Sequence, residues 1–292
     1  MRHASTRTKK QTHATHRPKG VQPKTTLPPL RWEDGLAFFA MIGRATLEGL
    51  ASVGRFSLFV FRLLRYGLTP PYYGRQLVRH IIEMGYFSLP VVALTALFTG
   101  MVLALQTYTG FARLHAEGAV AHVVVVSLTR ELGPVLAGLM VAGRLGAAMA
   151  AEISTMGVTE QLDALVTLST NPLRYLVMPR LVAGLSTLPF LVLTADILGV
   201  LGGTLVSVHK LGLSTTAYLT QTNEAMKAID VISGLVKALA FGGIIVIAGC
   251  YHGYASRGGA RGVGRATTQA VVTASVFILL ANYALTVLFF GN

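Results

Sequence analysis

Charged residues are scarce in this sequence. Only 13% of its 292 residues are Asp, Glu, Lys or Arg, whereas 52% are hydrophobic. Soluble domains carry about 25% charged residues, so this composition argues against an ordinary soluble domain. The mean hydropathy of +0.58 agrees. The sequence therefore predicts a protein whose main solvent is lipid.

Cysteine and catalytic motifs are also rare or missing. The single cysteine, Cys250, excludes an internal disulfide and a cysteine-based metal cluster. Gly259 to Gly264 has the glycine spacing of a phosphate loop, but Arg265-Ala266 follows in place of the Lys-Ser/Thr pair that contacts phosphate and magnesium. The histidines form no HExxH or paired metal spacing, and no serine has a G-x-S-x-G frame. We predict no catalytic site, no metal site and no cofactor on this chain.

Acidic residues are absent from residues 1–31, which hold eight of the 25 Lys and Arg residues. The remaining 17 basic residues face 12 acidic ones, so the net charge of +13 comes mostly from this segment. Nucleic-acid binding by the rest of the chain is therefore not expected. The segment has few large apolar side chains, and we predict a disordered basic cytoplasmic tail attracted to anionic lipid. A transit peptide for an organelle is the alternative, because the segment is acid-poor and rich in Ser, Thr and Arg.

Long apolar segments make up most of the remaining chain. Residues 32–86 are interrupted by charges too frequent for the bilayer centre, which favours an interfacial amphipathic helix followed by an elbow. The later segments do not alternate apolar and polar residues as barrel strands do, so we predict an all-α membrane protein. Basic residues gather before the first of these segments and after the second and fourth, which predicts a cytoplasmic N-terminus. Five segments are long enough to cross a bilayer: about Phe87–Phe111, Val120–Ala151, Leu176–Val208, Ile232–Tyr254 and Thr267–Phe290.

Small residues recur every four positions along the second segment. This spacing allows two helix backbones to approach closely, either as general packing or as a specific dimer face. The row consists of Gly138, Ala142, Gly146 and Ala150.

Two charges, Arg130 and Glu131, precede Gly133-Pro134 within the same segment, where the proline should kink or break the helix. Charges in an apolar run must face protein, water or a polar ligand. They either form an ion-pair network with other helices or line a cavity that contacts a lipid headgroup. Asp196, another charge within an apolar segment, is expected to make a buried packing or dimer contact.

The polar stretch 159–168 reads as a short amphipathic helix. Glu160, Gln161 and Asp163 lie on its polar side. The helix is either a solvated interfacial element or one that docks into a groove of a partner protein on the cytoplasmic side. Its apolar face carries Val158, Leu162, Leu165 and Val166.

Several of these motifs together resemble one family. The run RELGPVLAGLMVAGRLGAAMAAEISTMGVTEQLDAL, then NPLRYLVMPR, with FTGMVLALQ before it and GVGRATTQAVV and FFGN after it, is similar to the MlaE/YrbE permeases. These are membrane subunits of ABC transporters that work with MCE-domain proteins. The resemblance covers about Leu89 to Asn292 and implies a homodimer. Its permease domain would span residues 87–292, with a coupling helix at about 154–168.

The resemblance also implies partners and a substrate. Two cytoplasmic ABC ATPase subunits would bind ATP and Mg and carry out hydrolysis, so this chain itself is not expected to be an enzyme. A ring of MCE-domain subunits, expected to be a hexamer, would lie on the periplasmic side, and a STAS-domain accessory protein is compatible with this assembly. The substrate would be phospholipid moved between the inner and outer membranes, which helps to maintain outer-membrane lipid asymmetry. The expected location is the bacterial inner membrane, with the plastid inner envelope as the alternative.

Site residues follow from the same resemblance. The expected contacts to the ATPase are Thr159, Glu160, Gln161 and Asp163. The expected walls of a lipid cavity between two permease copies are Leu103, Gln106, Thr107, Gly110, Phe111, Leu114, Arg130, Glu131, Leu132 and Val135. By spacing alone, one helical stripe would carry Leu103, Gln106, Thr107, Gly110 and Leu114.

Two other functions remain open from the residues alone. A stand-alone secondary transporter or channel would need midplane charges in repeated halves, and no convincing internal repeat is present. A membrane scaffold would depend on the basic segment 1–31 to recruit anionic partners.

Overall fold

The computed structural model describes residues 32–67, 73–114 and 116–291. The predicted tail, residues 1–31, lies outside the described residues. The chain divides into two compact units, residues 1–52 and 53–292. In the first unit the described part is helical and belongs to α1 (Trp32–Gly67). The interfacial position predicted for residues 32–86 stays a prediction.

The second unit contains five helices long and apolar enough to cross a membrane, as expected from the sequence. Across the described ranges every regular element is a helix and none is a strand, which confirms the all-α prediction. A helix satisfies its backbone hydrogen bonds within itself, and this explains why a chain surrounded by lipid is helical. The five spans are Gly74–Phe111, Val120–Val158, Leu173–His209, Ala228–Ala255 and Gly259–Phe290.

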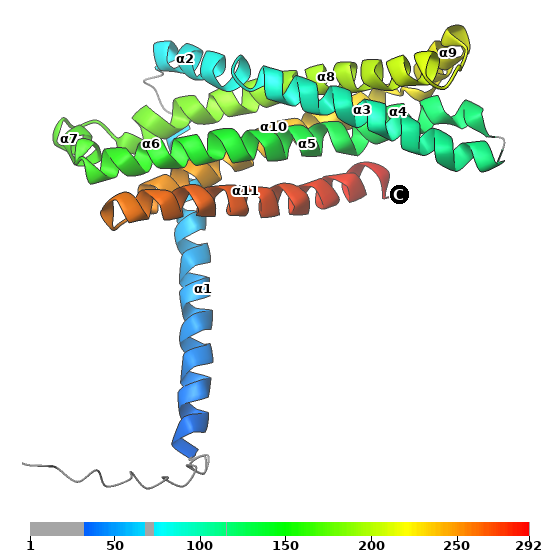
Figure 1. Ribbon diagram of the computed structural model, residues 1–292. Helices are drawn as coiled ribbons and strands as arrows, with labels where there is room; N and C mark the ends of the chain where they lie inside the picture. Colours follow the sequence, from blue (N-terminus) through cyan, green and yellow to red (C-terminus); the bar gives the residue numbers. More distant parts are fainter. Residues whose placement is uncertain (1–31, 68–72, 115, 292) are drawn as a thin grey trace, which may run out of the picture. The chain divides into compact units, whose positions relative to one another are not determined.

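The spans run side by side as a bundle, and two short helices mark its ends (Figure 1). We call the end at α7 the α7 end, and the opposite one the α9 end. The first span consists of α2 and α3, and the second is one continuous helix made of α4, η3, α5, η4 and α6. The bounds are α2 (Gly74–Gly85), α3 (Leu89–Phe111), η1 (Ala112–Leu114), η2 (Glu117–Ala119), α4 (Val120–Ser127), η3 (Leu128–Leu132), α5 (Gly133–Val141), η4 (Ala142–Gly146), α6 (Ala147–Val158), α7 (Gln161–Thr167), η5 (Leu173–Val177), α8 (Met178–His209), α9 (Thr215–Ala225), α10 (Ala228–Ala255) and α11 (Gly259–Phe290).

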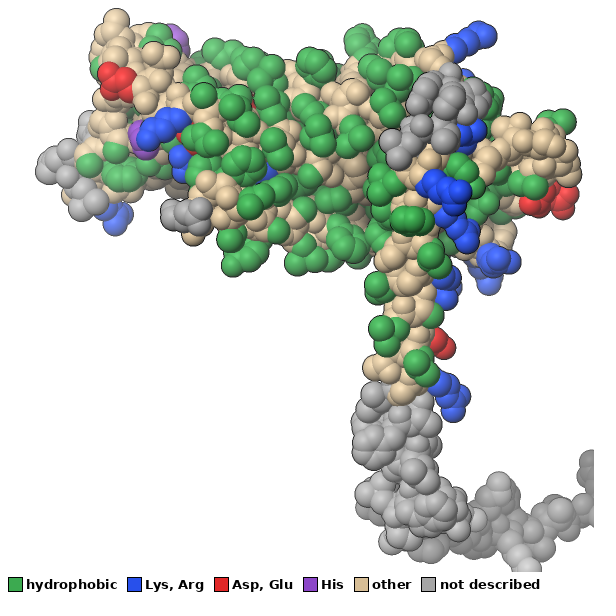
Figure 2. Space-filling view, turned by 180° about the vertical axis from the view of Figure 1, so that it is seen from behind, with side chains coloured by type: hydrophobic (Ala, Val, Ile, Leu, Met, Phe, Trp, Pro, Cys, Tyr) green, Lys and Arg blue, Asp and Glu red, His purple; other side chains and the backbone are tan. Residues whose placement is uncertain are grey.

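Large apolar side chains cover the outside of the bundle. Figure 2 shows hydrophobic side chains spread over its middle, with charged side chains gathered toward the ends. Phe98, Phe190 and Leu280 are 59%, 72% and 60% exposed. Such a surface would be unfavourable in water, so lipid or further protein covers it.

Close backbone contact holds the first and third spans together. A methyl group on Gly100 would collide with the carbonyl oxygen of Gly199, and one on Gly202 would collide with that of Leu97. Small residues thus replace interlocking side chains where α3 crosses α8, as is common between membrane helices.

The small-residue row of the second span faces α10 of the same chain. A methyl on Gly138 would lie 3.1 Å from the Phe241 ring, and Gly253 of α10 lies against the backbone of Ala150. Ala142 and Ala150 are fully buried. Within a single chain this row therefore serves packing between helices.

Residues 53–67 of α1 are anchored to the bundle by aromatic contacts. Phe56 and Phe59 lie with their ring centroids 5.1 Å and 5.5 Å from that of Tyr251 in α10. Leu63 is fully buried.

Candidate lipid and coupling sites

The second span is distorted where Pro134 interrupts its hydrogen bonding. The expected distortion takes the form of a π-helical turn, η3, in which the Gly133 N–H donates to the Leu128 carbonyl. Pro134 has no N–H, so the Arg130 carbonyl four residues earlier loses its normal donor. The ammonium group of Lys237 in α10 donates to this carbonyl at 2.8 Å. The turn is therefore completed by a side chain from another span.

Glu131 is the centre of a polar network between three spans. Its Oε1 accepts hydrogen bonds from Lys237 Nζ and Thr286 Oγ1, both at 2.8 Å, and its Oε2 accepts one from Asn282 Nδ2 at 2.7 Å. Lys237 is fully buried, whereas the Glu131 side chain is 38% exposed. Buried charges need such partners because desolvation of an unpaired charge is costly.

Arg130 joins the same three spans by a different route. Its Nε lies 2.6 Å from Oδ1 of the fully buried Asp230, and its guanidinium lies 4.3 Å from the centroid of the Phe290 ring. Of the two roles expected for Arg130 and Glu131, the ion-pair network is present within one chain. Both side chains also keep an exposed part.

The other expected cavity residues lie in three different surroundings. Leu103, Phe111 and Leu132 pack against a small apolar cluster near the α9 end that includes Leu128 and Tyr218. A second group consists of the exposed residues Gln106 and Gly110. Thr107 is buried, Val135 packs against the main core, and the side chain of Leu114 lies outside the described residues.

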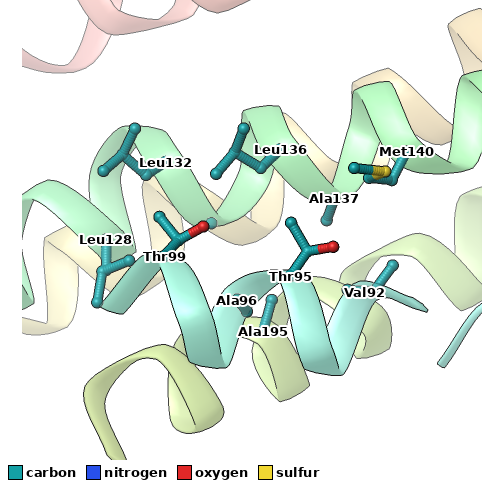
Figure 3. Close-up of a pocket in the computed structure, with 11 residues that line it drawn as sticks. Val92, Thr95, Ala96, Thr99, Leu128, Leu132, Leu136, Ala137, Met140 and Ala195 are labelled. Carbon is teal, nitrogen blue, oxygen red and sulfur yellow. The ribbon is translucent and has the colours of Figure 1, made fainter. Parts of the chain in front are cut away.

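A small cavity of about 10 Å³ separates α3 from the second span (Figure 3). Thr95 and Thr99 of α3 face Leu132 and Leu136 across it. The sequence interpretation missed these two threonines. The spacing could have identified Thr99, because it lies seven residues before Gln106 and so continues the same helical stripe.

The predicted coupling helix, residues 154–168, covers the end of α6, a turn at Thr159 and Glu160, and α7. Glu160, immediately before α7, and Ser169, shortly after it, have φ values of 58° and 57°. The left-handed conformation costs a non-glycine residue about 1–2 kcal/mol, so these sharp turns must be stabilised by the surrounding structure. The expected partner contacts, Thr159, Glu160, Gln161 and Asp163, are all exposed.

Only part of the apolar face expected for α7 is covered. Leu162 and Leu165 pack against the core of the bundle. Val158 and Val166 remain 49% and 57% exposed, and Leu168 is 74% exposed. The helix is thus fixed on one side and presents both apolar and acidic groups on the other.

An ion pair connects the two spans that flank α7. Arg180 in α8 is almost completely buried, and its Nη2 lies 2.8 Å from Glu152 Oε1 in α6. Its Nη1 also donates to the Leu176 carbonyl at 3.0 Å. The pair therefore holds α6 and α8 together beside α7.

Among the residues that the structure describes, no group of three or more His, Cys, Asp and Glu side chains is placed to hold a metal ion.

These features define a multi-pass α-helical membrane protein with polar groups within its spans and a short exposed helix between the second and third span. The family model described as Permease MlaE matches residues 77–288. The chain belongs to the MlaE permease family.

Relatives from two bacteria and a plant support this assignment. A probable ABC transporter permease protein from Rickettsia felis is 59% identical over 249 residues, 85% of this chain and 96% of the relative. The intermembrane phospholipid transport system permease protein MlaE of Haemophilus influenzae is 33% identical over 258 residues, 87% and 98% of the two chains. TRIGALACTOSYLDIACYLGLYCEROL 1, a chloroplastic protein of Arabidopsis thaliana, is 37% identical over 216 residues, 74% of this chain and 62% of the relative.

Proposed function

We propose that this chain is the membrane-spanning subunit of an ATP-driven phospholipid transporter. The names of the relatives support ABC transport, and that of the Haemophilus protein supports phospholipid as the substrate. The observation that carries the proposal is α7, a helix with an exposed acidic side that packs against the core of the bundle through Leu162 and Leu165. It lies between two spans that the Arg180–Glu152 pair joins. A subunit without an ATP site of its own needs such an element to receive force from an ATPase.

The proposed assembly contains two copies of this chain and two ABC ATPase subunits that bind ATP and Mg. The ATPase would dock at the α7 end, on the cytoplasmic side, through Thr159, Glu160, Gln161 and Asp163. An MCE-domain ring would lie at the α9 end, on the periplasmic side of the bacterial inner membrane, and a STAS-domain protein could bind the ATPase. Phospholipid movement between the two membranes would help to maintain outer-membrane lipid asymmetry.

The lipid cavity is proposed to form between two copies near the α9 end. The exposed face of α3 at Gln106 and Gly110 lies beside the apolar residues Leu103 and Phe111. An apolar wall with a few polar groups suits acyl chains and a headgroup. Arg130 and Glu131 would contribute their exposed parts to the rim, with Thr107, Leu114, Leu132 and Val135 completing the set.

Replacement of Glu160 by lysine should uncouple ATP hydrolysis from lipid movement. The change reverses one exposed charge immediately before α7. Lysine and glutamate adopt the left-handed conformation of this position, φ 58°, at a similar cost, so the backbone should be unaffected. Loss of about 1.4 kcal/mol at the contact weakens ATPase docking about tenfold. Lipid transfer per ATP hydrolysed, measured in proteoliposomes with the complete complex, should fall by a similar factor.

Glu48→Lys is the matched control, because it makes the same charge change on an exposed residue of α1 that the proposed assembly assigns to no contact. It should leave the ratio of lipid moved to ATP hydrolysed unchanged. Equal coupling in the Glu160→Lys and Glu48→Lys proteins would refute the role of α7.

A further inference from the structure

A polar stripe follows α3 for most of its length and begins at its N-cap residue, Ser88. Ser88, Thr95, Thr99 and Gln106 are spaced by seven, four and seven residues. At 100° per residue they lie within about 40° of one another, along about 27 Å of helix. The stripe ends at Gln106, in the proposed lipid cavity.

The two threonines in the middle of this stripe leave their hydroxyls available. In a helix, threonine commonly bonds to the carbonyl four residues earlier, as Thr129, Thr187 and Thr194 do here. Among the hydrogen bonds found for the described residues, none uses the hydroxyl of Thr95 or Thr99. Figure 3 shows both side chains directed toward the second span.

Arg144 lies at the other end of the stripe. Leu132, Leu136, Met140 and Arg144 recur every four residues on the second span, and the first three line the small cavity opposite the threonines. Arg144 Nη1 donates to Ser88 Oγ at 2.7 Å, and Ser88 is only 1% exposed. A buried hydroxyl of the first span thus holds an exposed arginine of the second.

Arg144 also borders an open groove of about 710 Å³ beside α2. Three arginines face a single carboxylate there, which gives the groove a net positive charge suited to phosphate. The apolar residues of the lining suit acyl chains, which inorganic phosphate would not require. The lining consists of Arg75, Val78, Arg79, Ile82, Glu83, Phe87 and Arg144.

We propose that this groove receives the phosphate headgroup of a phospholipid and that the polar stripe of α3 is the route between the groove and the cavity at Gln106. Arg144 binds the phosphate first. The cavity beside Thr95 and Thr99 is only about 10 Å³, room for about one water, so α3 and the second span separate there as the headgroup passes. The two hydroxyls then replace water around the headgroup, while the acyl chains remain in lipid or against Leu136 and Met140. This inference rests on the proposed phospholipid transport.

The test uses a photo-crosslinking amino acid, benzoylphenylalanine, at one position of the full-length chain in the assembled complex. The membranes carry phospholipid labelled with ³²P in the headgroup and ¹⁴C in the acyl chains. Position 99 samples the stripe and position 103 the cavity. Position 98, whose native Phe98 is 59% exposed, is the comparison position on the same helix outside the stripe.

We expect adducts at position 99 that carry both labels, and a severalfold loss of these adducts when Arg144→Gln is introduced. The adduct at position 98 should not change. Adducts at position 99 that survive Arg144→Gln, or that carry ³²P without ¹⁴C, would overturn the route, the latter because the ligand would be free phosphate. Labelling at position 103 without labelling at 99 would overturn the route and leave the proposed function intact, whereas no labelling at either position would count against both.

A second variant covers the case in which Arg144→Gln does not assemble. Thr95→Val removes one hydroxyl of the stripe and keeps the branched shape of the side chain. It should lower the adduct at position 99 severalfold. Thr194→Val is its control, because the Thr194 hydroxyl bonds to Phe190 of its own helix at 2.8 Å; equal adduct yields in these two proteins would also overturn the route.

Discussion

Replacement of Lys237 by methionine is expected to destabilise the protein strongly. The methionine fills a similar volume but leaves Glu131 without its cation and the Arg130 carbonyl without a donor. Breaking a buried ion pair costs about 3–5 kcal/mol, and we expect about 2–3 kcal/mol here because the Glu131 side chain is 38% exposed. The measurement is thermal unfolding of the detergent-solubilised chain, followed by the loss of monodisperse protein.

The double variant Glu131→Gln/Lys237→Met tests whether the unpaired charge causes this loss. The neutral amide removes the stranded charge and can still bond with Asn282 and Thr286. The double variant should therefore be more stable than Lys237→Met alone. If the two variants unfold at the same temperature, packing at Lys237 and not its pairing with Glu131 accounts for the effect.

Replacement of Gly100 by alanine is expected to separate the first and third spans. The added methyl would meet the backbone of Gly199, which cannot move aside like a flexible side chain. Overpacking costs about 1–3 kcal/mol and sometimes more, against at most about 1 kcal/mol gained from the higher helix propensity of alanine. Thermal unfolding in detergent should show a clear loss of stability.

Gly110→Ala is the control on the same helix. A methyl there meets nothing within 4 Å, so only the gain in helix propensity remains and stability should be unchanged or slightly higher. Equal stability of the Gly100→Ala and Gly110→Ala proteins would show that the contact between α3 and α8 is looser than described.

Much of the fold could be predicted from the sequence because the membrane limits the choices. Apolar segments long enough to cross a bilayer have to be helices, so the segment that begins at Phe87 and the four that follow it predict the architecture. The short helix after Glu160 could also be predicted, because the polar stretch between two apolar segments has the spacing of an amphipathic helix.

The pairing of charges could not be predicted in the same way. Lys237 and Glu131 are 106 residues apart, and no local pattern connects them. The same limit applies to Arg144 and Ser88, which are separated by 56 residues. Helix periodicity gives the face on which a residue lies, whereas the partner of that face depends on how the spans pack.

The central claim is that hydrolysis of ATP by a partner moves phospholipid through this chain. The most direct measurement is transfer of labelled phospholipid out of proteoliposomes that contain this chain and its co-purified ATPase, with ATP or a non-hydrolysable analogue, and with or without an ion gradient. We predict transfer with ATP alone and none with the analogue. Transfer driven by the ion gradient without ATP would contradict the account and favour a secondary transporter.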